Sequence, residues 1–193
     1  MKVTILDYGA GNIQSVQFAL EQLGVQAKLS NQSEDILSSD KVIFPGVGQA
    51  QSAMNQLKST GLNLLIPSLK QDVLGICLGM QLLCNYSDEG QTKGLGVFNI
   101  NVQRFNNNVK VPHMGWNLIE DLKSDVFLRL KSPTYMYSVH SYYAPICDLT
   151  IATTKYDTLF SSALKKDNFY GVQFHPEKSS QDGAQVLENF LNL

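Results

Sequence analysis

The clearest sign of the architecture is Val73-Leu74-Gly75-Ile76-Cys77-Leu78-Gly79-Met80-Gln81. A short apolar run typical of a buried strand leads into Cys77, and a helical pattern follows over Leu78–Tyr86. A sharp strand-to-helix turn strains its central residue, so small neighbours are needed, and the two flanking glycines supply them. The turn would place the sulfur at the helix N-terminus, where the dipole favours the thiolate, and would leave the Leu78 N–H free to face an oxyanion. We therefore predict a nucleophile elbow with cysteine as the nucleophile.

Upstream of this segment, short apolar runs alternate with helical patterns. The runs predict strands, and the i, i+3, i+7 spacing of apolar residues between them predicts helices. The predicted strands are Val3–Leu6, Val25–Leu29 and Val42–Phe44, and the predicted helices run between Asn12 and Gly24 and over Gln49–Ser59. Strands that are apolar throughout are typical of a parallel sheet with helices on both faces.

Downstream of the cysteine segment, strand patterns follow one another with short turns between them. The predicted strands are Val97–Phe105, Val109–Val111, Asn117–Ile119, Met136–Tyr143, Thr150–Thr154 and Phe169–Phe174, with a turn at Asn106–Asn108 and a closing helix at Asp182–Leu191. We predict a single α/β domain over residues 1–193. It has a mostly parallel central sheet flanked by helices, with an antiparallel or mixed extension in the second half.

Length and composition narrow the class of protein. The chain has 193 residues, of which 44% are hydrophobic and 17% charged, and its formal net charge is −2. This length fits one domain with a core of its own. The near-balance of charge argues against a nucleic acid partner, and no apolar stretch is long enough to span a membrane. Three cysteines are a small and odd number, so we expect a reduced, cytoplasmic protein rather than a disulfide scaffold.

A cysteine nucleophile needs a proton acceptor, and the chain has three histidines. His175 follows the last predicted strand, and parallel strands end at the same edge of a sheet, so we expect it near Cys77. Glu177, two residues on, can accept the other N–H of the imidazole and complete a Cys-His-Glu triad. His113 and His140 rank below His175 as the base because neither has a carboxylate within three residues.

The remaining cysteines and the glycine loops form no cofactor motif. Cys84 has no glycine frame and fits helix packing, Cys147 fits a bystander role, and no C-x-x-C metal spacing occurs. Pro45-Gly46-Val47-Gly48 lacks the third glycine of the dinucleotide fingerprint, whose position holds Gln51, and no P-loop motif is present. We therefore expect neither a metal nor another cofactor. N–H groups of this loop are candidates for a second oxyanion donor, and a tight turn without that role stays equally open.

Together, the elbow Gly75–Gly79, the tripeptide His175-Pro176-Glu177 and the loop Pro45–Gly48 resemble the class I (triad) glutamine amidotransferases. The resemblance runs over essentially the whole chain. It implies that Cys77 attacks the side-chain amide of L-glutamine, with the histidine and the glutamate completing the triad. It also implies an oxyanion hole at Leu78, Val47 and Gly48 and a glutamine pocket formed by Gly46, Gly48, Gln81, Glu89, Ser141 and Tyr142.

Three segments are similar to the glutaminase subunits of histidine biosynthesis, namely Asp7–Asn12, Pro112–Asn117 and His175–Ser180. The resemblance implies that ammonia passes to a separate cyclase subunit of (β/α)8-barrel type. That subunit would form imidazole glycerol phosphate and an aminoimidazole carboxamide ribonucleotide. The expected cyclase contacts are Lys178, Tyr137, Met114, Trp116 and Asn12. For Met114 and Trp116, ordinary core packing is an equally open alternative.

Two other functions stay open at this point. One is another triad enzyme, such as the glutaminase partner of pyridoxal phosphate synthase or a γ-glutamyl hydrolase. The other is a non-catalytic member of the family that acts as a binding or regulatory module. The intact set of Cys77, His175 and Glu177 speaks against the second, and the sequence around Met114 and Lys178 favours histidine biosynthesis over the first.

Overall fold

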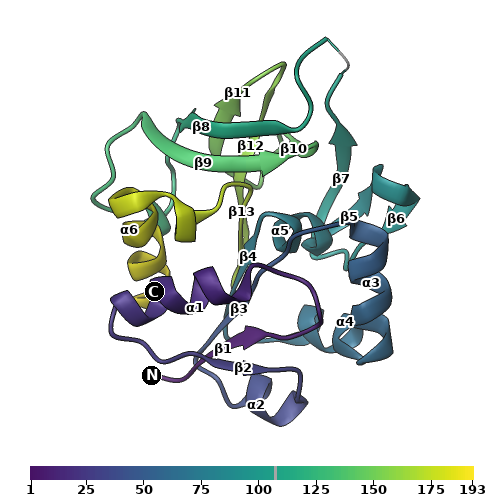
Figure 1. Ribbon diagram of the computed structural model, residues 1–193, viewed down its shortest axis with the longest axis vertical. Helices are drawn as coiled ribbons and strands as arrows, with labels where there is room; N and C mark the ends of the chain where they lie inside the picture. The colour runs from purple at the N-terminus through teal and green to yellow at the C-terminus, as the bar shows by residue number, and fades with distance from the viewer. Residues whose placement is uncertain (107) are drawn as a thin grey trace.

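The computed structural model describes residues 1–106 and 108–193. Its largest feature is a sheet whose first part is parallel, in the order β2-β1-β3-β4-β13 (Figure 1). These strands are β2 (Lys28–Ser30), β1 (Val3–Leu6), β3 (Lys41–Phe44), β4 (Asp72–Ile76) and β13 (Phe169–Val172). Every residue of β1, β3 and β13 is buried, as expected for parallel strands that are covered on both faces.

The second half of the chain extends this sheet in the order β13-β12-β10-β7-β5-β6, and β11 pairs with β12 on a branch. Most of these pairs are antiparallel, while β5 and β7 run parallel. The bounds are β5 (Cys84–Ser87), β6 (Thr92–Lys93), β7 (Phe98–Arg104), β10 (Tyr142–Pro145), β11 (Thr150–Lys155) and β12 (Leu159–Lys166). The predicted fold class, a mostly parallel sheet with a mixed extension, is confirmed.

A separate two-stranded ribbon lies across one end of the large sheet (Figure 1). It pairs β8 (His113–Ile119) with β9 (Thr134–His140), antiparallel. The ribbon is tied to the segment after β13, because the His175 N–H donates to Tyr137 O at 2.8 Å. It therefore lies against the carboxyl end of β13, where side chains of the parallel strands converge.

Helices cover both faces of the sheet (Figure 1). α1 (Ile13–Gln22) and α6 (Ser180–Leu191) pack their apolar stripes into one core, whereas α3 (Ala50–Ser59), α4 (Leu62–Leu65) and α5 (Leu78–Leu83) pack into a second core. The shorter elements are α2 (Ser33–Leu37) and the single turns η1 (Ile66–Ser68), η2 (Glu89–Gln91), η3 (Asp125–Phe127) and η4 (Pro176–Lys178). Two cores on opposite faces hold the central strands rigidly between them.

The helix after Cys77 is shorter than the sequence pattern predicts. It ends at Leu83, and Cys84–Ser87 form β5 instead of continuing the helix to Tyr86. The carbonyls of Leu82 and Cys84 accept hydrogen bonds from the Leu95 and Gly96 N–H groups at 2.8 and 3.1 Å, so a returning segment replaces the helical partners. The pattern over Leu78–Tyr86 misled because residues 84–87 are held by pairing with β6 and β7.

Other predicted boundaries also need correction. Val109–Val111 is not a strand, because the ribbon begins only at His113, after a proline that has no N–H to donate to a ladder. The strand predicted at Val25–Leu29 begins at Lys28, and Met136–Tyr143 is divided at Ser141 into β9 and β10. β12 was not predicted. The predicted turn at Asn106–Asn108 includes residue 107, which lies outside the described residues.

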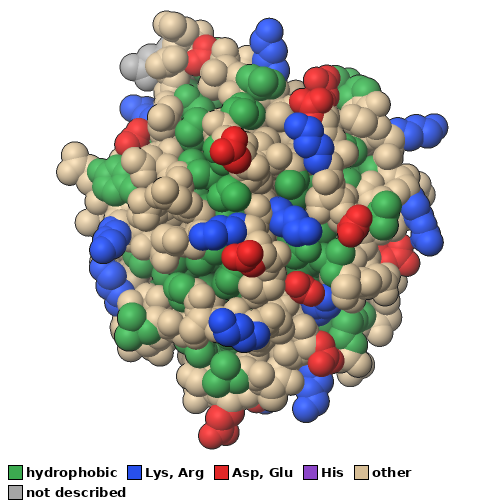
Figure 2. Space-filling model, turned by 180° about the vertical axis from the view of Figure 1, so that it is seen from behind, with side chains coloured by type: hydrophobic (Ala, Val, Ile, Leu, Met, Phe, Trp, Pro, Cys, Tyr) green, Lys and Arg blue, Asp and Glu red, His purple; other side chains and the backbone are tan. Residues whose placement is uncertain are grey.

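The surface carries charged side chains of both signs, as expected from a sequence with a net charge of only −2. Figure 2 shows acidic and basic side chains interspersed among hydrophobic ones on the face opposite to that of Figure 1. Among the described helices, none combines the length and the apolar character that a membrane crossing requires.

Candidate active site

Cys77 occupies a strained turn between β4 and α5. Its backbone angles are φ 52° and ψ −109°, a region that non-glycine residues rarely adopt. A Cβ on Gly79 would overlap Phe44 O, and one on Gly75 would lie 2.8 Å from Met80 N. Both glycines of the Gly-x-Cys-x-Gly motif are therefore required by the close approach of the backbone around the elbow.

The glycine loop after β3 is fixed at its base and open at its tip. A Cβ on Gly46 would lie 2.5 Å from Gly79 N, and the Tyr8 hydroxyl donates to Pro45 O at 2.7 Å. By contrast, Val47 is 39% exposed, and Gly48 has φ +97° with no described atom within 4 Å of a Cβ placed there. The N–H groups at the tip can therefore reorient without moving the core.

The sheet brings His175 to the elbow. β13 pairs in parallel with β4, and Val172 lies opposite Ile76, so the residues that follow each strand leave the sheet at the same edge. His175 Nδ1 lies 2.8 Å from Glu177 Oε1, and both side chains are 1% exposed. Within the described part of the chain, Nε2 of the same ring has no hydrogen-bond partner. The free nitrogen belongs to a residue that lines the same cavity as Cys77.

The electrostatics of this group favour a charged imidazole. Burial lowers the pKa of His175, but the Cys77 thiol and the Glu177 carboxylate outweigh burial and raise it to about 10. At neutral pH the His175 ring therefore holds a second proton.

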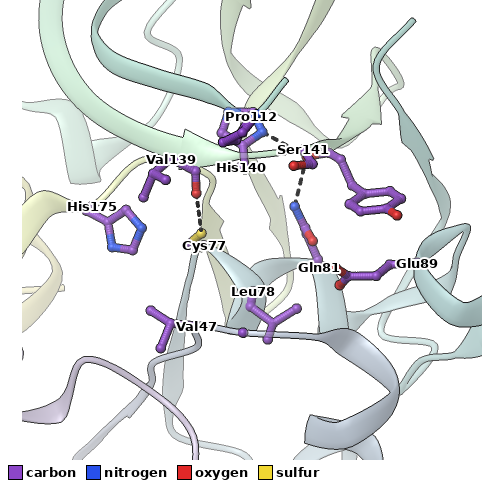
Figure 3. A pocket seen from close by; sticks show the side chains of 12 residues that line it. Val47, Cys77, Leu78, Gln81, Glu89, Pro112, Val139, His140, Ser141 and His175 are labelled. Atoms are coloured by element: carbon purple, nitrogen blue, oxygen red, sulfur yellow. Dashed lines mark hydrogen bonds between the residues drawn. The ribbon is translucent and has the colours of Figure 1, made fainter. Parts of the chain in front are cut away.

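A cavity of about 240 Å³ opens at the elbow (Figure 3). Its walls include most of the residues predicted from the sequence: Val47, Gly48, Cys77, Leu78, Gln81, Glu89, Ser141, Tyr142 and His175. Gly46 lies beneath the elbow and Glu177 behind His175, so neither lines the cavity. Pro112, Val139 and His140 line it without having been predicted to do so.

The far end of the cavity carries hydrogen-bond acceptors. Gln81 Nε2 donates to Tyr142 O at 2.9 Å and to Gln173 Oε1 at 2.8 Å, which leaves Gln81 Oε1 as the free acceptor of that amide. Glu89 lies beside Gln81 (Figure 3) and accepts the Ala50 N–H at 2.8 Å. Burial raises the pKa of the Glu89 carboxyl.

Gln173 was missed by the sequence analysis. Its Nε2 lies 3.7 Å from Cys77 Sγ, and the side chain is 1% exposed. No local pattern marks it, because its partners Gln81 and Cys77 lie 92 and 96 residues away in the sequence. The described residues contain no cluster of three or more His, Cys, Asp or Glu side chains suited to a metal ion.

The remaining cysteines lie outside the cavity wall. Cys84 is fully buried in the core, as its packing prediction requires, although it begins a strand and not a helical turn. Cys147 is half-buried and packs against the same core.

Three of the predicted cyclase contacts, Met114, Trp116 and Tyr137, lie on the ribbon. Met114 and Trp116 on β8 are 61% and 52% exposed, so the core-packing alternative is wrong for both. Trp116 pairs with the half-buried Tyr137, and their ring centroids are 6.2 Å apart. Lys178 is exposed in η4, and Asn12 is half-buried just before α1.

A glutamine amidotransferase class-I family model matches residues 4–193. The chain belongs to the class I glutamine amidotransferases. It is 53% identical to the imidazole glycerol phosphate synthase subunit HisH of Bacteroides thetaiotaomicron and 47% identical to the protein of that name from Pectobacterium atrosepticum, each over 100% of both chains. Within the amidotransferases it groups with the HisH glutaminases.

Solved structures show the same amidotransferase fold. A GMP synthase subunit from Thermoplasma acidophilum superimposes with a TM-score of 0.76 at 22% identity, over 100% of this chain and 92% of that one. A structure described as a glutamine amidotransferase gives a TM-score of 0.78 at 16% identity, over 100% and 98% of the two chains. At these identities the likeness concerns the fold alone.

Proposed function

We propose that this HisH-type glutaminase hydrolyses L-glutamine to glutamate and ammonia through Cys77, His175 and Glu177. We also propose that the whole chain forms a single domain. The observation that carries the proposal is the imidazole held by Glu177 at 2.8 Å, with its second nitrogen unpartnered among the described residues and located in the cavity wall beside the strained cysteine. A nucleophile, a base and a group that orients the base are the parts that acyl transfer needs.

The Cys77 thiolate attacks the carboxamide carbon of glutamine and forms a tetrahedral intermediate. The Leu78 N–H, which has no acceptor within its helix because it is the first helical residue, stabilises the oxyanion, together with an N–H of Val47 or Gly48. His175 gives its proton to the departing nitrogen, so ammonia leaves and a γ-glutamyl thioester remains. His175 then takes a proton from water, which attacks the thioester, and glutamate leaves as the Cys77 thiolate and the protonated His175 are restored.

Polar groups of the cavity wall select glutamine by binding its α-ammonium and α-carboxylate. Gln81 Oε1 and the Glu89 carboxylate suit the α-ammonium of the substrate, because one is a free acceptor and the other an opposite charge. Backbone groups of Gly48, Ser141 and Tyr142 suit the α-carboxylate, and Gly46 holds the loop that carries Gly48.

Ammonia that escapes into water is protonated and lost as a nucleophile, so we propose that it passes directly to a cyclase subunit of (β/α)8-barrel type. That subunit uses it to form imidazole glycerol phosphate and an aminoimidazole carboxamide ribonucleotide. The docking face comprises Asn12, Met114, Trp116, Tyr137 and Lys178. It includes the exposed Met114, which lies opposite the cavity-lining Val139 on the ribbon, and this suits a partner that covers the site. We place the reaction in the cytoplasm, where a catalytic thiolate stays reduced.

The test is glutamine hydrolysis by the heterodimer in the presence of the cyclase and its ribonucleotide substrate. Cys77→Ala should lower kcat by about 1000-fold or more, because removing the nucleophile disables the whole triad. Cys147→Ala is the matched control and should retain activity, since that thiol lies outside the cavity wall. Activity retained by Cys77→Ala would refute the mechanism.

A further inference from the structure

His113 and His140 are buried side chains that no step above uses. They lie directly opposite each other on β8 and β9, and they are 4% and 6% exposed. His113 Nδ1 and His140 Nε2 are 3.1 Å apart. His140 also lines the active-site cavity, so this pair connects the ribbon to the substrate pocket.

The hydrogen bonds around the pair have a single possible direction when both rings are neutral. A carbonyl can only accept, so His140 Nδ1, 2.8 Å from Tyr142 O, carries the proton of that ring. His140 Nε2 is then an acceptor, and His113 Nδ1 donates to it. His113 Nε2 in turn accepts from Asn117 Nδ2 at 3.0 Å.

The hydrogen bonds of Asn117, at the other end of this hydrogen-bond chain, agree with the same direction of donation. Asn117 Oδ1 accepts the Leu118 N–H at 2.9 Å, which turns Nδ2 of the amide toward His113. Both ends therefore require the Nδ1–H tautomer on both rings. Aromatic rings enclose the pair: Tyr156 stacks on His113 at 4.0 Å, and Phe105 and Phe160 lie 5.4 and 5.5 Å from His140.

Burial keeps both imidazoles uncharged. It lowers the pKa of His113, and it lowers the pKa of His140 to about 3 against the opposing hydrogen bond to Tyr142 O. Neutral rings at neutral pH are what the one-way chain requires, because an imidazolium has no acceptor nitrogen.

The hydrogen-bond chain ends at Tyr142 O, a backbone carbonyl of the substrate pocket. Tyr142 O receives two donors, His140 Nδ1 and Gln81 Nε2 at 2.9 Å, and these fix both the Ser141–Tyr142 backbone and the Gln81 amide. The starting end lies on β8, where the exposed Trp116 precedes Asn117.

We propose that His113 and His140 are positioning residues, which hold the Ser141–Tyr142 edge of the glutamine pocket from the strand that also carries the docking face. The proposal rests on the proposed function, because it takes the pocket to bind glutamine. The tautomers of the two rings do not depend on that function and can be measured separately.

The first experiment records the ring nitrogens of both histidines by long-range ¹H–¹⁵N NMR on the wild-type chain at neutral pH. We expect neutral rings protonated at Nδ1 for His113 and His140. A ring protonated at Nε2 in either residue would break the chain and overturn the proposal, whatever the enzyme's substrate.

The second experiment measures KM for glutamine and kcat in the heterodimer with the cyclase and its ribonucleotide substrate. His140→Leu should raise KM about tenfold, the size of one lost hydrogen bond to a pocket carbonyl, and should change kcat much less. His140→Asn can still donate to Tyr142 O and should restore KM to within about threefold of the wild type. The double variant His113→Leu with His140→Leu should raise KM no further than His140→Leu alone, because both substitutions interrupt the same hydrogen-bond chain.

Phe160→Leu is the matched control, because it removes packing against His140 but no member of the chain. We expect its KM to stay at the wild-type value. Equal KM increases for His140→Leu and Phe160→Leu, or no recovery in His140→Asn, would reduce the pair to packing and overturn the proposal. Failure of the wild-type heterodimer to hydrolyse glutamine would instead overturn the proposed function, and the NMR result would still stand.

Discussion

At the scale of single residues, Cys77 explains the composition of its neighbourhood. A non-glycine residue at φ 52° costs about 1–3 kcal/mol, and the fold has to offset that strain. The Cys77 N–H donates to Val172 O at 2.8 Å, and close backbone contacts at Gly75 and Gly79 hold the turn in place. The strain points the thiol into the cavity rather than into the core.

His140 gives a prediction for acid stability. Its folded pKa of about 3 lies below the value of about 6.5 for a free imidazole, so the unfolded chain binds a proton that the folded chain refuses. The stability that this group contributes is full above about pH 6.5 and is lost as the pH falls toward 3. Urea unfolding should be measured between pH 6.5 and 5. As the pH is lowered, the free energy of unfolding of the wild type should fall more steeply than that of His140→Asn, by up to about 1.4 kcal/mol per pH unit.

His175 does not interfere with this measurement. Its pKa is raised, so its contribution is full below about pH 6.5 and is lost only as the pH rises toward 10. Identical pH slopes for the wild type and His140→Asn would mean that the pKa of His140 is the same in the folded and unfolded chains.

Side chains next to strand ends could be predicted from the sequence, and side chains paired across strands could not. Cys77 and His175 were expected at one edge because parallel strands end together, and the structure places both in one cavity wall. Gln173 and the link between His113 and His140 depend on strand register over long separations in sequence. Single-sequence patterns carry no register information of that kind.

At the scale of elements, one carboxylate joins the pocket to a helix. Glu89 in η2 accepts the N–H of Ala50, the first residue of α3, where the helix dipole favours negative charge. Its position therefore serves helix stability and, in our proposal, substrate binding at once.

The two roles of Glu89 can be separated. Glu89→Gln keeps an acceptor for Ala50 but removes the charge, so KM for glutamine should rise about tenfold or more while the free energy of unfolding changes little. Glu89→Ala should raise KM as much and also lower the free energy of unfolding by about 1 kcal/mol. Steady-state kinetics and urea unfolding check both. An unchanged KM in Glu89→Gln would remove Glu89 from the glutamine pocket.

Helix and strand boundaries were harder to predict from the sequence than the presence of the central strands. Strands buried on both faces, such as β1, β3 and β4, were predicted closely because their apolar runs are continuous. β12 was missed because Ser161 and Ser162 interrupt its apolar pattern, although both are buried in the sheet. The end of α5 at Leu83 is set by tertiary pairing, which local periodicity does not encode.

At the scale of the whole molecule, the ribbon presents apolar side chains to solvent. Met114, Trp116 and Tyr135 are each more than half exposed, and exposed apolar side chains grouped on one element are typical of an interaction surface. The ribbon also holds His175 through Tyr137 O. A partner on this face would therefore touch the strands that support His175.

Trp116→Asp should weaken cyclase binding by about tenfold or more, because an aromatic anchor is replaced by a charge. The thermal midpoint of the free chain should stay within about 2 °C, since the side chain is exposed. Leu64→Asp is the control: Leu64 is 78% exposed on α4, at the other end of the molecule (Figure 1). Calorimetric titration with the cyclase measures both variants, and equal loss of affinity in the two would place the interface elsewhere.

The borders of the large sheet bear on how the protein behaves when concentrated. β2 and β6, at its two ends, are three and two residues long, so each presents few free backbone groups to another chain. The longer β11 is shielded, because Glu120 exchanges two hydrogen bonds with Thr153 and the Lys123 N–H donates to Ile151 O. Strand-to-strand aggregation through this sheet is disfavoured at all three borders, so the chain is protected from fibre-like association while its ribbon stays available to a partner.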